Sequence, residues 1–237
     1  MDNVREGRGG RIPLWLKIIC TAFVAVLVPF YLKTYGPLNF LSFCDAALFL
    51  TVLGLWLESR LVLSMQAVGI VLPQLAWIVD FVLRAVFGHP VMGLTDYMFD
   101  PGIGLFVRIL SSFHGWLPLV LIFSLWRLGY DRRAFVLQAI FGVALLLASF
   151  LFTPRPPPRY VGQVVNINWV FGLGDKSVQT WMAPGLYLVV EMIVFVVCMF
   201  LPAHLVFSRL FAGRVGRGWM RLRSQAVMRG RGNSHVR

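Results

Sequence analysis

Charged residues are scarce in this chain, and acidic residues are the scarcest. Only 14% of the 237 residues are charged, with 10 Asp and Glu against 22 Lys and Arg, while 58% are hydrophobic. An ordinary soluble domain carries about 25% charged residues, so this composition excludes one. It predicts an integral membrane protein.

Cysteine is also rare. The three cysteines, Cys20, Cys44 and Cys198, are an odd number and lie in three different apolar stretches, which does not indicate a disulfide framework. No internal repeat and no soluble domain interrupts the sequence. The first apolar stretch is too long for a signal peptide and lacks a small-residue cleavage site, so we expect the first helix to be retained.

Long apolar stretches fill most of the sequence. Crossing the hydrocarbon core of a bilayer takes about 20 apolar residues, and six such stretches can be placed. They cover residues 12–32, 39–57, 61–87, 103–126, 134–153 and 183–207. A basic segment, 1–11, precedes them and an Arg-rich tail, 208–237, follows. The predicted fold is an all-α polytopic membrane protein with six transmembrane helices.

The basic residues are distributed unevenly between the two sides of these spans. With the N-terminus inside, sixteen of the 22 Lys and Arg fall on the inner side, which predicts that both termini are cytoplasmic. We expect the cytoplasmic (inner) membrane of a bacterium. The tail should bind anionic lipid headgroups, at about 1 kcal/mol for each basic residue near the surface. No nucleic-acid recognition fold accompanies the charge, so we expect no nucleic-acid partner.

A few ionisable groups lie inside the apolar stretches. Counted from the outer end of each predicted helix at 1.5 Å per residue, they lie roughly 7 to 17 Å below the outer surface. The group consists of Cys44, with Asp45 beside it, Asp80, His114 and Glu191. A charge at the bilayer centre costs from ~3 to more than 10 kcal/mol, so such groups indicate a functional site by default.

Cys44 and His114 are the two parts of a thiolate nucleophile and its general base. A carboxylate, Asp45 or Asp80, can hold the imidazole in the required tautomer. The structural alternatives remain open, because buried cysteines behave as small hydrophobic residues and buried polar groups hold membrane helices together. No span offers two metal ligands one turn apart, so we expect neither a metal nor another cofactor.

Two long outer connections, 88–102 and 154–182, mix aromatic and polar residues, and we expect them to pack back on the bundle and roof its outer mouth. They and the adjoining helices supply the candidate substrate-binding residues. These are Tyr97, Arg108, Asn166, Asn168, Trp169 and Glu191.

Three short motifs follow one another in an order that is similar to that of a known family. They are Phe43-Cys44-Asp45-Ala46, Ser111-Ser112-Phe113-His114-Gly115 and Asn166-Ile167-Asn168-Trp169-Val170-Phe171, before a last helix with Glu191. Over about residues 38–205, the chain resembles the YwaF/TMEM164-like family of six-span integral membrane proteins.

This resemblance implies a cysteine acyltransferase that moves a fatty acyl chain between membrane phospholipids. Cys44 would carry the acyl group and His114 would act as general base, with Asn166 or Asn168 stabilising the oxyanion. The competing hypothesis is a non-enzymatic membrane protein, either a lipid or small-molecule binder or an assembly scaffold. Proton-coupled transport is disfavoured because no inverted repeat with paired broken helices is present.

Overall fold

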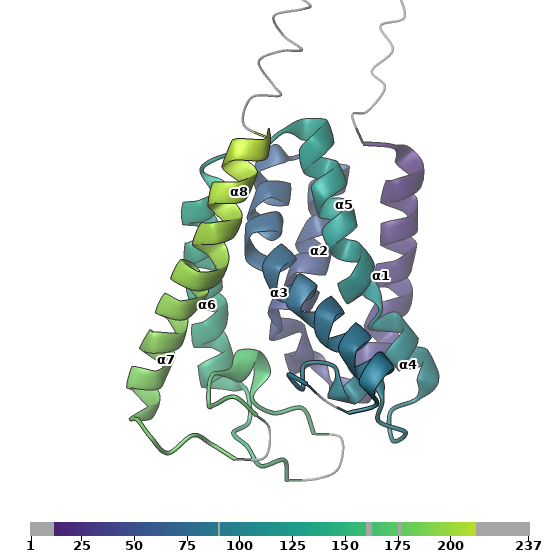
Figure 1. Cartoon of the computed structure of the whole chain (residues 1–237). Helices are drawn as coiled ribbons and strands as arrows, with labels where there is room; N and C mark the ends of the chain where they lie inside the picture. Colours follow the sequence, from purple (N-terminus) through teal and green to yellow (C-terminus); the bar gives the residue numbers. More distant parts are fainter. Residues whose placement is uncertain (1–11, 90, 160–162, 175–176, 212–237) are drawn as a thin grey trace, which may run out of the picture.

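The computed structural model describes residues 12–89, 91–159, 163–174 and 177–211. In these residues the chain forms helices and no strand. Figure 1 shows the helices side by side in one bundle, with both ends of the described chain at the top. The all-α prediction is confirmed. The predicted segment 1–11 and all but the first four residues of the predicted tail lie outside the described residues.

The helical elements follow the predicted spans closely. In chain order they are α1 (Leu14–Tyr35), η1 (Pro37–Leu41), α2 (Phe43–Trp56), α3 (Arg60–Phe87), η2 (Asp96–Met98), α4 (Leu105–Leu110), α5 (Phe113–Leu128), α6 (Ala134–Phe152), η3 (Ile167–Trp169), α7 (Pro184–Val194), η4 (Phe195–Phe200) and α8 (Leu201–Phe211). The short element η4 is π-helical and the other η elements are 3-10 helices.

Five helical stretches in the described residues are long and apolar enough to cross a membrane. They are α1, α3, α4 with α5, α6, and α7 through α8. Large apolar side chains cover their outer faces, as at Val86, Leu119 and Leu151, which are 71%, 67% and 70% exposed. Exposure of such an apolar surface to water would be unfavourable, whereas lipid tails can cover it. The chain is therefore an integral membrane protein.

Two predicted spans differ in detail from the helices observed. The span 39–57 begins as the 3-10 helix η1, and α2 has only 14 residues because the extended backbone of Ser42 separates the two. The span 103–126 is divided into α4 and α5 at Ser111 and Ser112. The Ser111 hydroxyl donates to the carbonyl of Val107 at 3.2 Å, a local bond that serines use in competition with the helix ladder.

Helix α3 is the centre of the bundle and packs against α2, α5, α6 and α8. Its enclosed face is a stripe at helical spacing formed by Leu63, Ala67, Ile70 and Gln74, each at most 1% exposed. The helix begins at a serine cap, in which the Ser59 hydroxyl accepts a hydrogen bond from the backbone of the first turn. It ends at a glycine, Gly88, which adopts a left-handed conformation (φ 75°).

The last helix passes close to α6 at Gly142. In the π-helical element η4, backbone hydrogen bonds join residues five positions apart. Phe195 and Phe200, at the two ends of η4, both pack against the ring of Phe43. The Phe43 ring stacks on Phe195 with centroids 4.9 Å apart and meets Phe200 edge-on at 6.2 Å. A β-carbon added at Gly142 would lie 2.8 Å from the Phe200 ring. The absence of a side chain at Gly142 therefore allows this packing.

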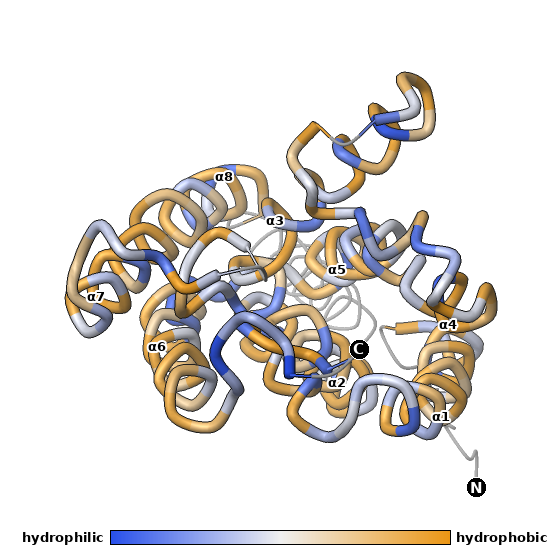
Figure 2. The backbone as a smooth tube through the Cα atoms, turned by 90° about the horizontal axis from the view of Figure 1, so that it is seen from below, coloured by the Kyte–Doolittle hydropathy of each residue, from blue (hydrophilic) through white to orange (hydrophobic). Residues whose placement is uncertain are grey.

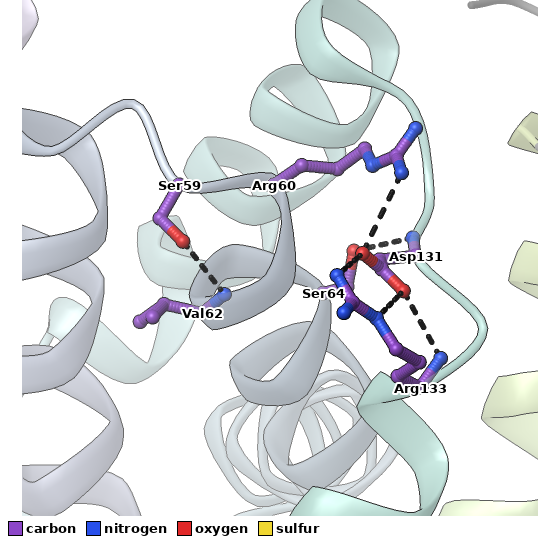
Figure 3. Close-up of polar contacts among 6 residues, drawn as sticks. All are labelled: Ser59, Arg60, Val62, Ser64, Asp131 and Arg133. Carbon is purple, nitrogen blue, oxygen red and sulfur yellow. Dashed lines mark hydrogen bonds and ion pairs between the residues drawn. The ribbon is translucent and has the colours of Figure 1, made fainter.

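At the upper end of the bundle, Asp131 in the loop between α5 and α6 joins three elements (Figure 3). Its carboxylate accepts two hydrogen bonds from the Arg133 guanidinium, at 2.9 and 3.1 Å. It also forms an ion pair with Arg60 of α3, at 3.5 Å. Its backbone amide donates to the Ser64 hydroxyl at 3.0 Å. Hydrogen bonds from Arg133 lower the pKa of Asp131 below its ordinary value.

We expect Gly142→Ala to destabilise the protein by about 1–3 kcal/mol, because the fully buried Phe200 ring has no space into which it can move. Thermal unfolding in detergent measures this. The matched control is Gly115→Ala in the first turn of α5, where an added β-carbon meets no atom within 4 Å. Alanine favours a helix by about 1 kcal/mol over glycine, so the control should keep or gain stability. Equal behaviour of the two variants would contradict the packing described.

We expect Asp131→Asn to cost about 1–3 kcal/mol at neutral pH, the range for hydrogen bonds to a buried charged group. Because the pKa of Asp131 is lowered in the folded protein, its contribution is complete above about pH 4, the unfolded value. It is lost as pH falls through the folded pKa. Unfolding curves of the two proteins should therefore converge below pH 4. A stability difference that persists unchanged at pH 2 would refute the role of the ionised carboxylate.

Candidate functional site

A cavity of about 570 Å³ lies at the end of the bundle opposite the ends of the described chain. Both outer connections contribute to its wall, in line with the predicted roof. Its lining residues are Tyr31, Thr34, Tyr35, Asn39, Ser42, Asp45, Tyr97, Asp100, Gly102, Ile103, Gly104, Ser111, His114, Pro158, Gln163, Val164 and Val165. Seen from this end, the helices are mostly hydrophobic and the hydrophilic stretches lie largely on the connecting segments (Figure 2).

Asp45 is the buried charged group of the cavity wall, only 2% exposed. It lies in the first turn of α2, where its backbone amide donates to the capping Ser42 hydroxyl at 3.3 Å. Its Oδ2 accepts from the Asn39 side-chain amide at 2.7 Å and from the Ser42 hydroxyl at 3.4 Å. Its Oδ1 is buried and has no hydrogen-bond partner among the described residues. One carboxylate oxygen is thus fixed, and the other is buried without a hydrogen bond among the described residues.

Two tyrosines one turn apart on α1 form a second part of the wall. The Tyr31 and Ser111 hydroxyls are 2.6 Å apart, which links α1 to the break between α4 and α5. The Tyr35 hydroxyl is buried and has no partner in the described part of the chain. The two rings are nearly perpendicular, with centroids 5.1 Å apart and an interplanar angle of 87°. They form an aromatic corner beside the carboxylate.

His114 enters the cavity wall from the first turn of α5. Its Nδ1 lies 2.7 Å from the carbonyl oxygen of Ser111, and since a carbonyl only accepts, Nδ1 donates. In the neutral ring this leaves Nε2 as a proton acceptor. The imidazole stacks on Trp77 of α3, with centroids 5.0 Å apart and planes 20° from parallel. The ring is therefore held in one orientation.

Tyr97 in the loop after α3 completes this side of the cavity. Its hydroxyl accepts a hydrogen bond from the Trp77 indole at 3.0 Å. Burial raises the pKa of Tyr97 above its ordinary value, so the group keeps its proton. With its acceptor side occupied by Trp77, the hydroxyl can donate to a bound molecule.

Cys44 is next to Asp45 in sequence but is not among the lining residues. It is half-buried and packs against the hydrophobic core. Its thiol lies beside the Gln74 side chain and within electrostatic reach of Tyr97. Neither polar atom of the Gln74 side-chain amide has a hydrogen bond of ordinary geometry in the described structure. The described residues show no hydrogen bond between the Cys44 thiol and the His114 imidazole.

Asp80 anchors a loop. It is fully buried on α3, and its Oδ1 accepts from the backbone amide of Met92 at 2.7 Å. Its Oδ2 accepts from the backbone amide and the hydroxyl of Thr95, at 3.0 and 2.8 Å. These bonds fix the segment that leads to Tyr97. Asp80 therefore acts on the cavity through the loop and does not line it.

The two asparagines of the second loop also hold the backbone in place. Asn168 donates to the carbonyl of Leu41 and to the Ser149 hydroxyl, both at 2.9 Å, and accepts from the amide of Phe43 at 2.9 Å. Asn166 bridges its own loop, accepting from the amide of Phe171 at 2.8 Å. Both have positive φ angles, which asparagine adopts more readily than most residues.

The remaining predicted site residues lie away from the cavity wall. Trp169 is 41% exposed and Arg108 donates to the carbonyl of Met98 at 3.1 Å. Glu191 on α7 is 8% exposed, and its Oε2 has no partner within the described part of the chain. Of the ten predicted site residues, the cavity brings together three, which are Asp45, Tyr97 and His114.

Several lining residues were not predicted from the sequence. Tyr31 and Tyr35 are not among the site residues predicted from the sequence, because tyrosines at the end of a span are typical of membrane interfaces. Asn39 and Ser42 carried a usable signal, since a serine three residues before an acid marks a helix start. Asp100 belongs to the connection 88–102, which the sequence predicts to cover the outer mouth of the bundle without singling out this residue.

No group of three His, Cys, Asp or Glu side chains in the described residues could hold a metal ion. A scan against protein-family models and searches of curated proteins and of solved structures found no match to this chain. Fold and site together define a helical integral membrane protein with a cavity at one end of its bundle, in which a few polar side chains lie in a largely apolar wall.

Proposed function

We propose that this membrane protein binds a lipid headgroup or another small polar molecule in the cavity. The observation that carries the proposal is the buried Asp45 carboxylate, whose Oδ1 has no partner among the described residues. A buried polar group without a partner costs about 1–3 kcal/mol, and a ligand that donates a hydrogen bond would recover this loss. The cavity volume of about 570 Å³ is within the usual range of ligand sites.

The arrangement of the helices supports six membrane crossings. Lys17 of α1 pairs with Glu58, after α2, at 2.8 Å, whereas Asn39, before α2, lines the cavity at the other end. Helix α2 therefore returns along the bundle, and its 14 residues rise about 21 Å. With η1 added, the pair approaches the thickness of a hydrocarbon core.

With six crossings, both termini lie on one side of the membrane. The excess of basic residues at that end supports a cytoplasmic position, and we place the protein in a bacterial inner membrane. The Arg-rich tail would then contact anionic headgroups of the inner leaflet. The cavity would open toward the outer side, within reach of phospholipid headgroups in the outer leaflet.

We expect Tyr35→Phe to separate binding from stability. The Tyr35 hydroxyl is buried and has no partner among the described residues, so its removal should leave the folded protein equally or more stable. The affinity for the bound molecule should fall about two- to tenfold, the size of one hydrogen bond. Native mass spectrometry of the full chain released from lipid nanodiscs measures the retained molecules, and thermal unfolding measures the stability.

Tyr187→Phe is the matched control, because Tyr187 is a buried tyrosine on α7 that does not line the cavity. It should leave retention unchanged. Absence of any retained lipid or small molecule from the wild-type protein, over a range of nanodisc compositions, would refute binding in the cavity.

Acyl transfer through Cys44 is the second candidate function. It is favoured by His114, which lines the cavity with Nδ1 held by the Ser111 carbonyl and Nε2 available as a base. In this proposal the Cys44 side chain turns toward the cavity and gives its proton to Nε2. The thiolate attacks the ester carbonyl of a phospholipid, and the ester C–O bond breaks to form a thioester. His114 returns the proton to the departing lyso-lipid oxygen.

A second lyso-lipid completes the transfer. Its hydroxyl gives its proton to His114 as it attacks the thioester, and the C–S bond breaks. His114 then reprotonates the released Cys44 thiolate. The reaction moves one acyl chain from one lipid to another and uses no cofactor.

We expect wild-type protein incubated with acyl-labelled phospholipid to acquire a label that hydroxylamine removes, and Cys44→Ser to lose it almost completely. Gel fluorography or intact-mass measurement detects the thioester. Cys198→Ser is the control, because Cys198 is exposed on η4 and takes no part in the proposed reaction. If Cys44→Ser keeps full labelling, the thioester mechanism is eliminated while the binding proposal remains.

A further inference from the structure

The cavity wall has an excess of negative charge in a protein of net charge +12. Two of the lining residues are acids, Asp45 and Asp100, and none of the described lining residues is a lysine or an arginine. Of the basic residues at this end of the bundle, Arg84 of α3 pairs with Asp96 and Arg108 of α4 donates to a backbone carbonyl. Lys33 and Arg159 are each next in sequence to a lining residue and do not themselves line the cavity. A ligand of negative charge would therefore meet two acids and no basic side chain among the described residues of the cavity wall.

The Asp45 carboxylate also lacks a positive counter-charge. Its contacts are the neutral Asn39 amide and Ser42 hydroxyl, both on Oδ2. The Oδ1 atom is buried in the cavity wall and has no hydrogen-bond partner in the described structure. A carboxylate that is 2% exposed is costly to keep ionised, and a bound cation would stabilise the ionised form over the protonated one.

Three aromatic rings line the same cavity as this carboxylate, a combination that suits an organic cation. Tyr31 and Tyr35 form a right-angled corner, with centroids 5.1 Å apart, and Tyr97 supplies a third ring to the same cavity. The faces of aromatic rings attract ammonium groups within about 6 Å. A small metal ion would need more oxygen or nitrogen ligands than are gathered there.

We infer that the molecule bound in the cavity carries an organic ammonium group, with Asp45 Oδ1 as its counter-charge and the rings of Tyr31, Tyr35 and Tyr97 as its enclosure. The inference rests on the proposed binding function and specifies its ligand class. Two sources share this chemistry. One is the headgroup of a zwitterionic phospholipid that enters from the outer leaflet, and the other is a free amine from the outer aqueous side.

The first test uses the full-length protein in detergent, titrated calorimetrically with choline chloride and with tetramethylammonium chloride against sodium chloride at equal ionic strength. The wild type should bind both organic cations. Asp45→Asn, which keeps the side-chain shape and the acceptor for Asn39, should weaken binding roughly ten- to a hundredfold, the size of a lost charge-assisted contact.

Asp100→Asn is a second variant that does not depend on the folding of the buried site, because Asp100 is an exposed loop residue. It should weaken binding by a smaller factor. Asp131→Asn is the control for the loss of one negative charge, since Asp131 lies at the opposite end of the bundle and does not line the cavity, and it should leave binding by the folded protein unchanged. Binding of the organic cations that is equal in Asp45→Asn and the wild type would overturn the inference.

The second test distinguishes the two sources. The protein is equilibrated in nanodiscs that contain equal parts of phosphatidylcholine, phosphatidylethanolamine and phosphatidylglycerol, and the retained lipids are identified by native mass spectrometry. Preferential retention of the two amine-bearing lipids, lost in Asp45→Asn, supports a headgroup ligand. Binding of free choline without any lipid preference supports a free amine.

Selective retention of phosphatidylglycerol, unaffected by Asp45→Asn, would overturn the ammonium inference and leave the binding function standing. Retention of no lipid or small molecule would remove both. The Tyr35→Phe experiment does not depend on the charge of the ligand, so the two failures can be told apart.

Discussion

A carboxylate enclosed at the end of an apolar bundle is the constraint on which this structure depends. Asp45 is held on one side by a helix cap and by Asn39, both supplied by the short segment that precedes α2. Burial of an ionised group costs several kcal/mol unless neighbouring charges or hydrogen bonds compensate. Only one of its two oxygens is compensated within the described residues, so in the proposed binding function Asp45 would gain a partner when a ligand enters.

Most of the other polar residues in the half of the bundle that contains the cavity hold backbone in place. Asp80 binds three donors of the first loop, and Asn168 joins the second loop to η1 and α6. These connections bring loop backbone close to apolar helices, where an unpaired amide or carbonyl would be expensive. The loops can therefore form a fixed wall over the bundle. These contacts fix the loops that shape the cavity, and Asp45 and Asp100 in its wall give it negative charge.

The sequence was a good guide to the helices and a partial guide to the site. Long apolar runs determine where a chain can cross a membrane, so the predicted span 134–153 and the helix Ala134–Phe152 nearly coincide. The division of α4 from α5 at Ser111 and Ser112 is a local feature of the backbone, which apolar composition does not reveal. Depth along a helix could be counted from the sequence, and it grouped Cys44, His114 and Glu191 at similar levels.

The direction in which each side chain faces around its helix could not be derived from the sequence in the same way. Residues at one depth can face a cavity, a neighbouring helix or lipid, and tertiary packing decides which. His114 faces the cavity because its ring stacks on Trp77, whereas Asp80 turns to a loop that had no predicted conformation. Tyr31 and Tyr35 became visible as site residues only when the break after α4 placed Ser111 against α1.

The π-helical turn of the last helix has an effect beyond the packing of its own phenylalanines. A turn that spans five positions holds one residue more than an α-helical turn, and each residue rotates an α-helix by about 100°. The inward side of α8, with Ala203, Phe207 and Phe211, is thus set relative to the inward side of α7 by this single extra residue. Without it, the two halves would share a continuous register, and the face of α8 that carries Ala203, Phe207 and Phe211 would be rotated by about 100° away from the protein interior.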